Sequence, residues 1–161
     1  MLDAMTEVAR GAHALHEAGL VHRGIKPSTV LLRSGGARLA DFGLVQALEP
    51  TQSMTSLGAI SAVDFVEPSL MSGHPATPAS DIWSLAATLH WGLTHEGLYG
   101  VLPADDPLFC VRRILTSQPR LSPALAAADA ELIERCLTGP PGERPKTALV
   151  MAETLERQPR Y

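Results

Sequence analysis

The sequence predicts a mainly α-helical domain of the α+β class that carries one small β-hairpin. Apolar residues recur every three or four positions in most segments, which is the period of a helix packed on one face. Two short apolar runs, at 30–32 and 38–40, flank a Ser-Gly-Gly turn at 34–36, a pattern typical of a hairpin. A length of 161 residues with 45% hydrophobic residues suits a single domain with a sizeable core.

Composition and charge argue against several classes of protein. No apolar run approaches the roughly 18 residues that a membrane span needs, and the first residues lack a basic-then-apolar export pattern. The formal net charge of −4 argues against a general affinity for nucleic acid or anionic membranes. Cys110 and Cys136 lie far apart in apolar helical surroundings. We therefore expect buried, reduced thiols rather than a disulfide, and a cytoplasmic protein.

The first predicted helix covers residues 2–18. Its apolar positions follow the helical period, and Gly19 is expected to end it as a C-terminal cap. His13 and His16 lie one turn apart, a spacing that could hold a metal ion. The sequence suggests no third ligand nearby, so we expect the two histidines to be structural.

The segment 22–43 is the centre of the functional interpretation. It reads HRGIKPSTVLLRSGGARLADFG, a basic loop followed by the predicted hairpin and then by Asp41. The hairpin would hold the basic loop and Asp41 at the same end, so that the residues that could do chemistry converge.

Helices and breakers alternate through the rest of the chain. The breaker at 75–78 precedes a strongly apolar helix at 81–93, with Ser80 as its predicted N-cap. Trp83 and Trp91 of this helix are expected to be core or helix-packing residues. The remaining predicted elements are a Gly-rich loop at 92–103, a helix at 107–115, a linker at 121–128, a helix capped by Asp129 and ending at Leu137, a breaker at 139–145 and a final helix at 147–157.

At these residues the sequence resembles the C-terminal lobe of a eukaryotic-type (Hanks-type) Ser/Thr protein kinase. The family's catalytic loop reads H-R-D-L-x-x-x-N, with an Asp base and an Asn that holds magnesium, and D-F-G follows. His22 and Arg23 match this frame, but Gly24 stands at the base position and Thr29 at the Asn position. The D-F-G motif is intact as Asp41, Phe42 and Gly43.

The resemblance implies a role for each residue of the loop. His22 would brace Phe42, and Arg23 would bind a phosphorylated activation segment through its guanidinium. Lys26 would neutralise a transferred phosphate. Gly24 offers no carboxylate to orient or deprotonate a substrate hydroxyl.

The implied metal site is correspondingly weak. Thr29 has one neutral oxygen where the family's Asn has a carbonyl, so it is a poorer magnesium ligand. Asp41 could hold one magnesium ion, but a single carboxylate binds it weakly. Together with Lys26, these residues form the expected but weak cofactor site.

Two further motifs carry the resemblance into the second half of the chain. In S-D-I-W, Asp81 would bond the backbone of the catalytic loop. At the family's A-P-E motif this chain has Glu67, Pro68 and Ser69, so the motif's Glu is replaced by Ser. That Glu normally pairs with an Arg that matches Arg144. We therefore expect Glu67 to take over as the partner of Arg144, because an unpaired buried charge costs several kcal/mol.

On this interpretation residues 1–161 form one kinase-like C-terminal-lobe domain. Its parts are the leading helix at 1–19, the catalytic loop, hairpin and D-F-G at 20–43, an activation segment at 44–69 and a helical subdomain at 80–157. The match starts at the first residue, and the Gly-rich phosphate loop, the strand Lys and the helix Glu of the family's N-terminal lobe are absent. The chain is then a natural remnant, a fragment, or one half of a two-chain assembly.

Two functions remain open at this point. The first is a catalytically impaired, pseudokinase-like module that binds or regulates another protein, with no cofactor. The alternative is a fragment of a Ser/Thr protein kinase that binds Mg-ATP and transfers phosphate when a small lobe is supplied. Both imply a protein partner or substrate and neither implies nucleic acid; the oligomeric state stays open.

Overall fold

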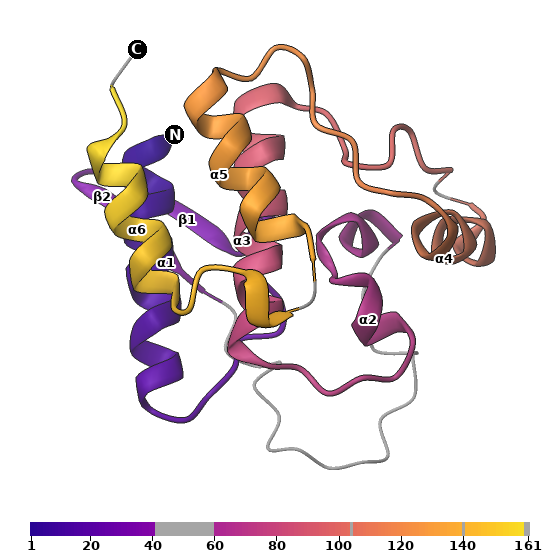
Figure 1. Ribbon diagram of the computed structural model, residues 1–161, viewed down its shortest axis with the longest axis horizontal. Coiled ribbons are helices and arrows are strands. Elements are labelled where there is room, and N and C mark those ends of the chain that lie inside the picture. The colour runs from indigo at the N-terminus through magenta and orange to yellow at the C-terminus, as the bar shows by residue number, and fades with distance from the viewer. Residues whose placement is uncertain (41–59, 104, 140, 160–161) are drawn as a thin grey trace.

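The computed structural model describes residues 1–40, 60–103, 105–139 and 141–159. The mainly helical fold with one two-stranded hairpin is confirmed in this part of the chain (Figure 1). The predicted Asp41, Phe42 and Gly43, and most of the predicted activation segment, lie outside the described residues. The described elements are α1 (Leu2–Glu17), a 3-10 turn (Pro27–Thr29), β1 (Val30–Arg33), β2 (Gly36–Leu39), a 3-10 segment (Ile60–Phe65), α2 (Pro68–Met71), α3 (Pro78–Thr94), α4 (Pro107–Thr116), α5 (Ala127–Leu137), a 3-10 turn (Pro141–Glu143) and α6 (Ala148–Arg157).

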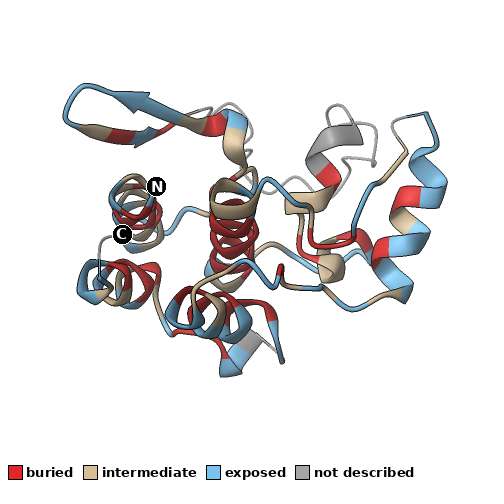
Figure 2. Ribbon diagram, turned by 90° about the horizontal axis from the view of Figure 1, so that it is seen from above, coloured by how far each residue is buried: buried red, intermediate tan, exposed pale blue. Residues whose placement is uncertain are grey.

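Helix α3 is the centre of the core. Helix α1 packs against α6, β2 and α3, while α5 packs against α3 (Figure 1). Figure 2 shows the buried residues gathered where the helices face one another. Apolar burial of this kind contributes about 25 cal/mol for each Å² removed from water. Fully buried core residues include Val8, Ala9, Ala12, Leu85, Ala86, Leu89, Ile133, Cys136, Met151, Ala152 and Leu155.

Gly19 ends α1 as predicted. Its φ of +73° is the left-handed conformation that glycine adopts without strain. The N–H of Leu20 donates to the carbonyl of Leu15 at 2.9 Å, and the N–H of Gly19 donates to His16 at 3.0 Å. This is the Schellman pattern, which satisfies two of the last carbonyls of the helix and turns the chain toward the basic loop.

The hairpin is antiparallel, with Val30 opposite Leu39 and Arg33 opposite Gly36. It is fixed to α1 by Glu7, whose carboxylate accepts a hydrogen bond from the N–H of Ala37 at 2.7 Å. Gly36 has a φ of +140°, and a Cβ at this position would collide with the Glu7 carboxylate. A glycine is therefore required where the turn approaches α1.

The start of α3 differs from the sequence prediction. Thr77, not Ser80, is the N-cap, and the helix begins at Pro78. Ser80 is the third helical residue: its hydroxyl accepts from the N–H of Thr77 at 3.0 Å, while the N–H of Ser80 donates to the Thr77 hydroxyl at 3.4 Å. Proline suits the first helical position because its missing N–H would have no partner there, so 75–78 includes the start of the helix and not only a breaker.

Three smaller predictions were also wrong. The helix α3 continues through Gly92 to Thr94 and ends at His95, which has a φ of +59°. Helix α5 begins at Ala127 rather than at Asp129, which is a buried residue of its first turn. Trp83 is in the core at 1% exposure, but Trp91 is 37% exposed.

The expectations for the cysteines are confirmed. Cys110 and Cys136 are buried and free. Burial raises the pKa of the Cys136 thiol to about 12 and also raises the pKa of Cys110, whose thiol donates to the carbonyl of Pro103 at 3.2 Å. Neither thiol is therefore a reactive thiolate near neutral pH.

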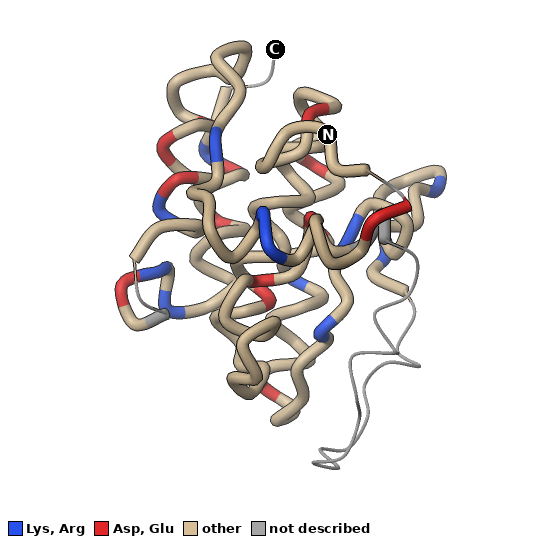
Figure 3. The backbone as a smooth tube through the Cα atoms, turned by 90° about the vertical axis from the view of Figure 1, so that its right-hand side faces the viewer, with Lys and Arg blue, Asp and Glu red and all other residues tan. Residues whose placement is uncertain are grey.

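Acidic and basic residues are mixed along the described chain and do not gather on a single basic face (Figure 3). In the described residues, no helix is both long enough and apolar enough to cross a membrane.

The ion pair expected between Glu67 and Arg144 is present. Glu67 Oε1 lies 2.7 Å from Arg144 Nη2, and both side chains are 5% exposed. Arg144 Nη1 also donates to the carbonyl of Ala79 at 3.1 Å. Glu67 precedes α2, Ala79 lies in the first turn of α3, and Arg144 precedes α6. One buried pair thus joins three segments that are far apart in the sequence.

We expect Glu67→Gln to lower the free energy of unfolding by about 3–5 kcal/mol, because it leaves the guanidinium of Arg144 buried without a counter-ion. Urea denaturation followed by far-ultraviolet circular dichroism measures this loss. The matched control is Glu153→Gln, which breaks the exposed pair with Arg157 and should cost less than about 1 kcal/mol. Equal losses for the two variants would contradict the role of the buried pair.

Candidate functional site

Asp81 anchors the predicted catalytic loop. Its Oδ2 accepts from the backbone N–H of His22 at 2.8 Å, and its Oδ1 accepts from the backbone N–H of Arg23 at 2.9 Å. His16 Nε2 lies 2.8 Å from Oδ2, with His16 6% and Asp81 1% exposed at the side chain. Both oxygens of a buried carboxylate are thereby satisfied, which offsets part of the cost of burying the charge.

Asp81 also holds Arg23 in an uncommon backbone conformation. Arg23 has a φ of +68°, a region that side chains with a Cβ rarely occupy. Its N–H bond to Asp81 keeps the backbone there, and its side chain stands exposed at the surface.

His22 connects this loop to the end of the hairpin. The ring is fully buried, and its Nδ1 accepts from the N–H of Gly24 at 3.3 Å. Nε2 therefore carries the proton and donates to the carbonyl of Ala40 at 3.0 Å. Ala40 immediately precedes Asp41, so His22 fixes the chain at the last described residue before that acid.

Thr29 faces into the loop. It is buried, and its hydroxyl accepts from the N–H of Lys26 at 3.0 Å. The same oxygen lies 3.0 Å from the carbonyl oxygen of Gly24 and 2.9 Å from that of Lys26. Its single proton is shared between two carbonyls, and a lone pair is already used by an N–H. The hydroxyl therefore closes the 3-10 turn, and its proton and one of its two lone pairs are already used inside the loop.

The two cations of the loop remain available. Arg23 is exposed and Lys26 is half-buried. Neither forms an ion pair with a residue that the structure describes. In the same described ranges, no group of three or more His, Cys, Asp or Glu residues is placed to hold a metal ion.

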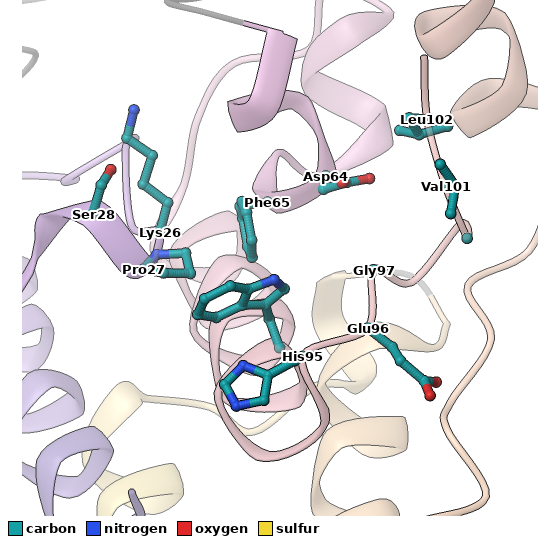
Figure 4. Close-up of a pocket in the computed structure, with 12 residues that line it drawn as sticks. Lys26, Pro27, Ser28, Asp64, Phe65, His95, Glu96, Gly97, Val101 and Leu102 are labelled. Carbon is teal, nitrogen blue, oxygen red and sulfur yellow. The ribbon is translucent and has the colours of Figure 1, made fainter. Parts of the chain in front are cut away.

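A cavity of about 650 Å³ opens beside Lys26 (Figure 4). Lys26, Pro27 and Ser28 form one end of it, and Val101 and Leu102 lie at the other end. The lining residues come from the basic loop, the 3-10 segment, the end of α3 and the loop that follows: Lys26, Pro27, Ser28, Asp64, Phe65, Trp91, His95, Glu96, Gly97, Gly100, Val101 and Leu102.

The sequence interpretation missed this cavity. Trp83 and Trp91 are eight positions apart, a spacing that keeps two residues on the same side of a helix, so the sequence did not distinguish them. Trp83 is buried in the core, whereas Trp91 faces the cavity.

Asp64 gives the cavity its most unusual chemistry. Its Oδ1 is buried and has no hydrogen-bond partner among the described residues, and burial raises the pKa of this carboxyl. Tyr99 is 3% exposed, and its hydroxyl also lacks a described partner. Burial, and then the charge of Asp64, raise the pKa of Tyr99 far above its usual value. The cavity wall thus holds a negative charge that no neighbouring cation compensates in the described structure.

The profile of the protein kinase domain matches residues 1–155 of the chain. Serine/threonine-protein kinase PknK of Mycobacterium tuberculosis strain CDC 1551 is 35% identical over 158 residues, which are 96% of this chain and 14% of PknK. The probable serine/threonine-protein kinase PkwA of Thermomonospora curvata is 32% identical over 146 residues, or 91% of this chain and 19% of PkwA. PknA of Mycobacterium tuberculosis strain H37Ra is 31% identical over 147 residues, or 89% of this chain and 33% of PknA. The chain thus spans at most a third of the length of these relatives.

We expect Asp64→Asn to be at least as stable as the native chain at pH 7. Because burial raises the pKa of Asp64 in the folded state, the unfolded chain gives up this proton first as the pH rises. The protonated carboxyl of Asp64 therefore stabilises the fold fully below its pKa in the unfolded chain. This stabilisation is lost as the pH rises through its higher pKa in the folded chain.

Thermal unfolding at pH 7 and at a pH below about 3.8 measures the difference. The advantage of Asp64→Asn should disappear at the acidic pH. Asp105→Asn, which removes a charge from a neighbouring exposed position, should show a smaller effect at pH 7. A native chain that is more stable than Asp64→Asn at pH 7 would mean that the carboxylate has a compensating partner.

Proposed function

The chain belongs to the protein kinase family, and we propose that it is a catalytically impaired member that binds another protein instead of transferring phosphate. Phosphoryl transfer in this family relies on positioning and electrostatics around an Asp base and a magnesium-binding Asn. The resemblance aligns these two positions with Gly24 and Thr29. The proposal treats the chain as a scaffold whose fold persists without that chemistry.

One observation carries the proposal: the hydroxyl of Thr29 is used inside the loop. It accepts from Lys26 and donates to a carbonyl, so it stabilises the loop in the absence of any ligand. Gly24, on the same turn, has no side chain that could act as a base. The hydrogen bonds of Thr29 and the missing side chain at Gly24 therefore both favour a loop that is held by internal hydrogen bonds and not by a bound metal.

The binding role rests on what the loop leaves accessible. The side chains of Arg23 and Lys26 are free of described ion pairs, and the cavity beside Lys26 is large enough to take several side chains of a partner. A net charge of −4 and the mixed charge distribution favour a protein partner over nucleic acid. A cytoplasmic location is part of the same proposal.

The alternative is a fragment of a Ser/Thr kinase that binds Mg-ATP and transfers phosphate once a small lobe is supplied. Lys26 favours it, because it forms no ion pair with a described residue and the resemblance assigns it to the transferred phosphate. The relatives above are named as serine/threonine-protein kinases, so proteins similar in sequence to this chain carry the name of that activity. The absence of a carboxylate at Gly24 is the main argument against it.

We expect millimolar Mg-ATP to leave the thermal unfolding midpoint of the native chain unchanged, because Thr29 replaces the family's magnesium-binding Asn and its hydroxyl is used inside the loop. A ligand present at 100 times its dissociation constant would add about 2.7 kcal/mol, which corresponds to a shift of several degrees for a domain of this size. Differential scanning fluorimetry with and without Mg-ATP, and with magnesium alone, measures the shift.

The comparison variant is Gly24→Asp with Thr29→Asn, which restores the family's two residues. A magnesium-dependent shift in this variant and none in the native chain would support the proposal. A shift in the native chain, accompanied by transfer of labelled phosphate to a Ser/Thr peptide, would overturn it in favour of the alternative.

A further inference from the structure

We propose that His90 is a pH-sensitive latch in the central helix. Its neutral imidazole fastens the α4–α5 connection, residues 117–126, to the end of α3, and the uptake of one proton by the imidazole releases this connection. The inference goes beyond the proposed function and does not depend on it, because the latch involves neither Gly24 nor Thr29.

The imidazole of His90 joins two loops. The residue lies in the last turns of α3 and is 1% exposed. Its Nε2 accepts from the backbone N–H of Ser122 at 3.0 Å, so this nitrogen carries no proton. Nδ1 therefore carries the proton and donates to the backbone carbonyl of Glu96 at 3.0 Å. Both ring nitrogens are satisfied as long as the imidazole is neutral.

A second proton on His90 would have no acceptor. In the imidazolium, Nε2 also becomes a donor, and it would face the N–H donor of Ser122. The hydrogen bond would be lost and a positive charge would be buried at the same time. Opening of the α4–α5 connection removes both costs, because Nε2 then reaches water.

The α4–α5 connection has few other attachments that would prevent this opening. It runs beside the chain that leads from α3 to α4, and the N–H of Arg120 donates to the carbonyl of Leu98 at 2.8 Å (Figure 1). Leu121 and Leu125 pack against the core but are only partly buried. Local opening therefore costs less than unfolding of the domain.

The turn around Ser122 does not need His90 to keep its shape. The hydroxyl of Ser122 accepts from the N–H of Ala124 at 3.3 Å, and its carbonyl accepts from the N–H of Leu125 at 3.3 Å. These bonds lie within the α4–α5 connection. The connection can therefore leave His90 as a preformed turn.

Burial is the largest influence on the proton of His90. It lowers the pKa of His90 from its usual 6.5, while the hydrogen bond to the carbonyl of Glu96 and the charge of the Glu96 carboxylate act in the opposite direction. Because the closed form has the lower pKa, the open form takes up the proton first as the pH falls. The latch is therefore fully closed above about pH 6.5, and it weakens as the pH falls from there to the lower pKa of the closed form.

The ion pairs that involve α3 lie at its other end. Asp81, which meets His16 of α1, is nine positions before His90, a distance of about 13 Å along the helix. Arg144, which pairs with Glu67, bonds the carbonyl of Ala79 in the first turn of α3. Charged side chains on α5 and on the α4–α5 connection are exposed to water: Arg120, Glu131, Glu134 and Arg135.

The remaining titratable groups beside α3 act in the opposite direction or stay neutral. Burial raises the pKa of Asp64 in the 3-10 segment and of Asp129 in α5, so the folded chain takes up these protons before the unfolded chain does. Both acids therefore stabilise the fold as the pH falls. Burial also raises the pKa of Tyr99 and Cys136, which stay neutral below pH 7. A loss of structure below about pH 6.5 thus distinguishes His90 from these four groups.

The test follows hydrogen exchange of the backbone amide of Ser122 in the native chain by nuclear magnetic resonance, from pH 7.5 to pH 5.0. Each rate is compared with the intrinsic rate at the same pH. We expect the protection of Ser122 to be constant above about pH 6.5 and to fall by up to about tenfold per pH unit below it, because one proton is taken up on opening. The amide of Leu155 in α6 is the internal control and should keep its protection. The ¹⁵N resonances of the His90 ring show the Nδ1–H tautomer and its protonation in the same samples.

Two variants locate the effect. His90→Gln offers a neutral oxygen to the N–H of Ser122 but cannot be protonated in this range, so the protection of Ser122 should not depend on pH. His74→Gln, which removes an exposed histidine, should leave the pH dependence of the native chain unchanged.

The latch would be overturned by Ser122 protection that is constant down to pH 5.0, that falls in parallel with Leu155, or that falls equally in His90→Gln. Ring resonances that show His90 protonated at or above about pH 6.5 would overturn it as well. If His90→Gln does not fold, the native chain decides alone, through the coincidence of the Ser122 change with the protonation of His90. The nucleotide and phosphotransfer measurements test the proposed function separately and are unaffected by any of these results.

Discussion

The carboxylate of Asp81 is the interaction on which the predicted catalytic loop depends. It is carried on α3, the helix at the centre of the described core, and accepts from two successive backbone N–H groups, those of His22 and Arg23, while its Oδ2 also lies 2.8 Å from His16 Nε2. Because Asp81 is almost completely buried, these contacts are stronger than they would be in water, and the loss of any one would be costly. These contacts hold the left-handed backbone of Arg23 and the buried imidazole of His22 in place.

The same loop contains two sets of residues: those that hold its backbone in place, and those at the positions that the family uses for phosphoryl transfer. His22 and Asp81 belong to a hydrogen-bond network that extends from α1 through α3 to the end of β2. Thr29 completes a second, local network that needs no ligand. A fold can therefore keep the frame of a phosphotransferase while the groups that face a nucleotide change, since the frame is stabilised by different atoms. This division is what the proposal of an impaired kinase requires, and it is compatible with the match to the family over residues 1–155.

Local signals allowed much of this fold to be predicted from the sequence. The period of α1, the Gly19 cap and the Ser-Gly-Gly turn depend on neighbouring residues, and the Glu67–Arg144 pair followed from a displaced acid near a known partner. The cavity could not be predicted in the same way. It exists only where the basic loop, the 3-10 segment and the end of α3 converge, and those segments lie about 40 and 30 residues apart in sequence. The start of α3 was missed because Pro78 was read as a breaker, although proline is also favoured at the first position of a helix.

The partly buried carboxyl of Asp64 connects the stability of the domain with the open cavity beside Lys26. Asp64 is partly buried and its Oδ1 has no described partner, so its charged form lowers the stability of the domain, and the raised pKa of Asp64 expresses that cost. The surrounding wall is not a dry core, because it borders an open cavity with an exposed indole. Removing the charge by Asp64→Asn should therefore leave the free domain no less stable at neutral pH, although it changes the wall of an open cavity rather than the core.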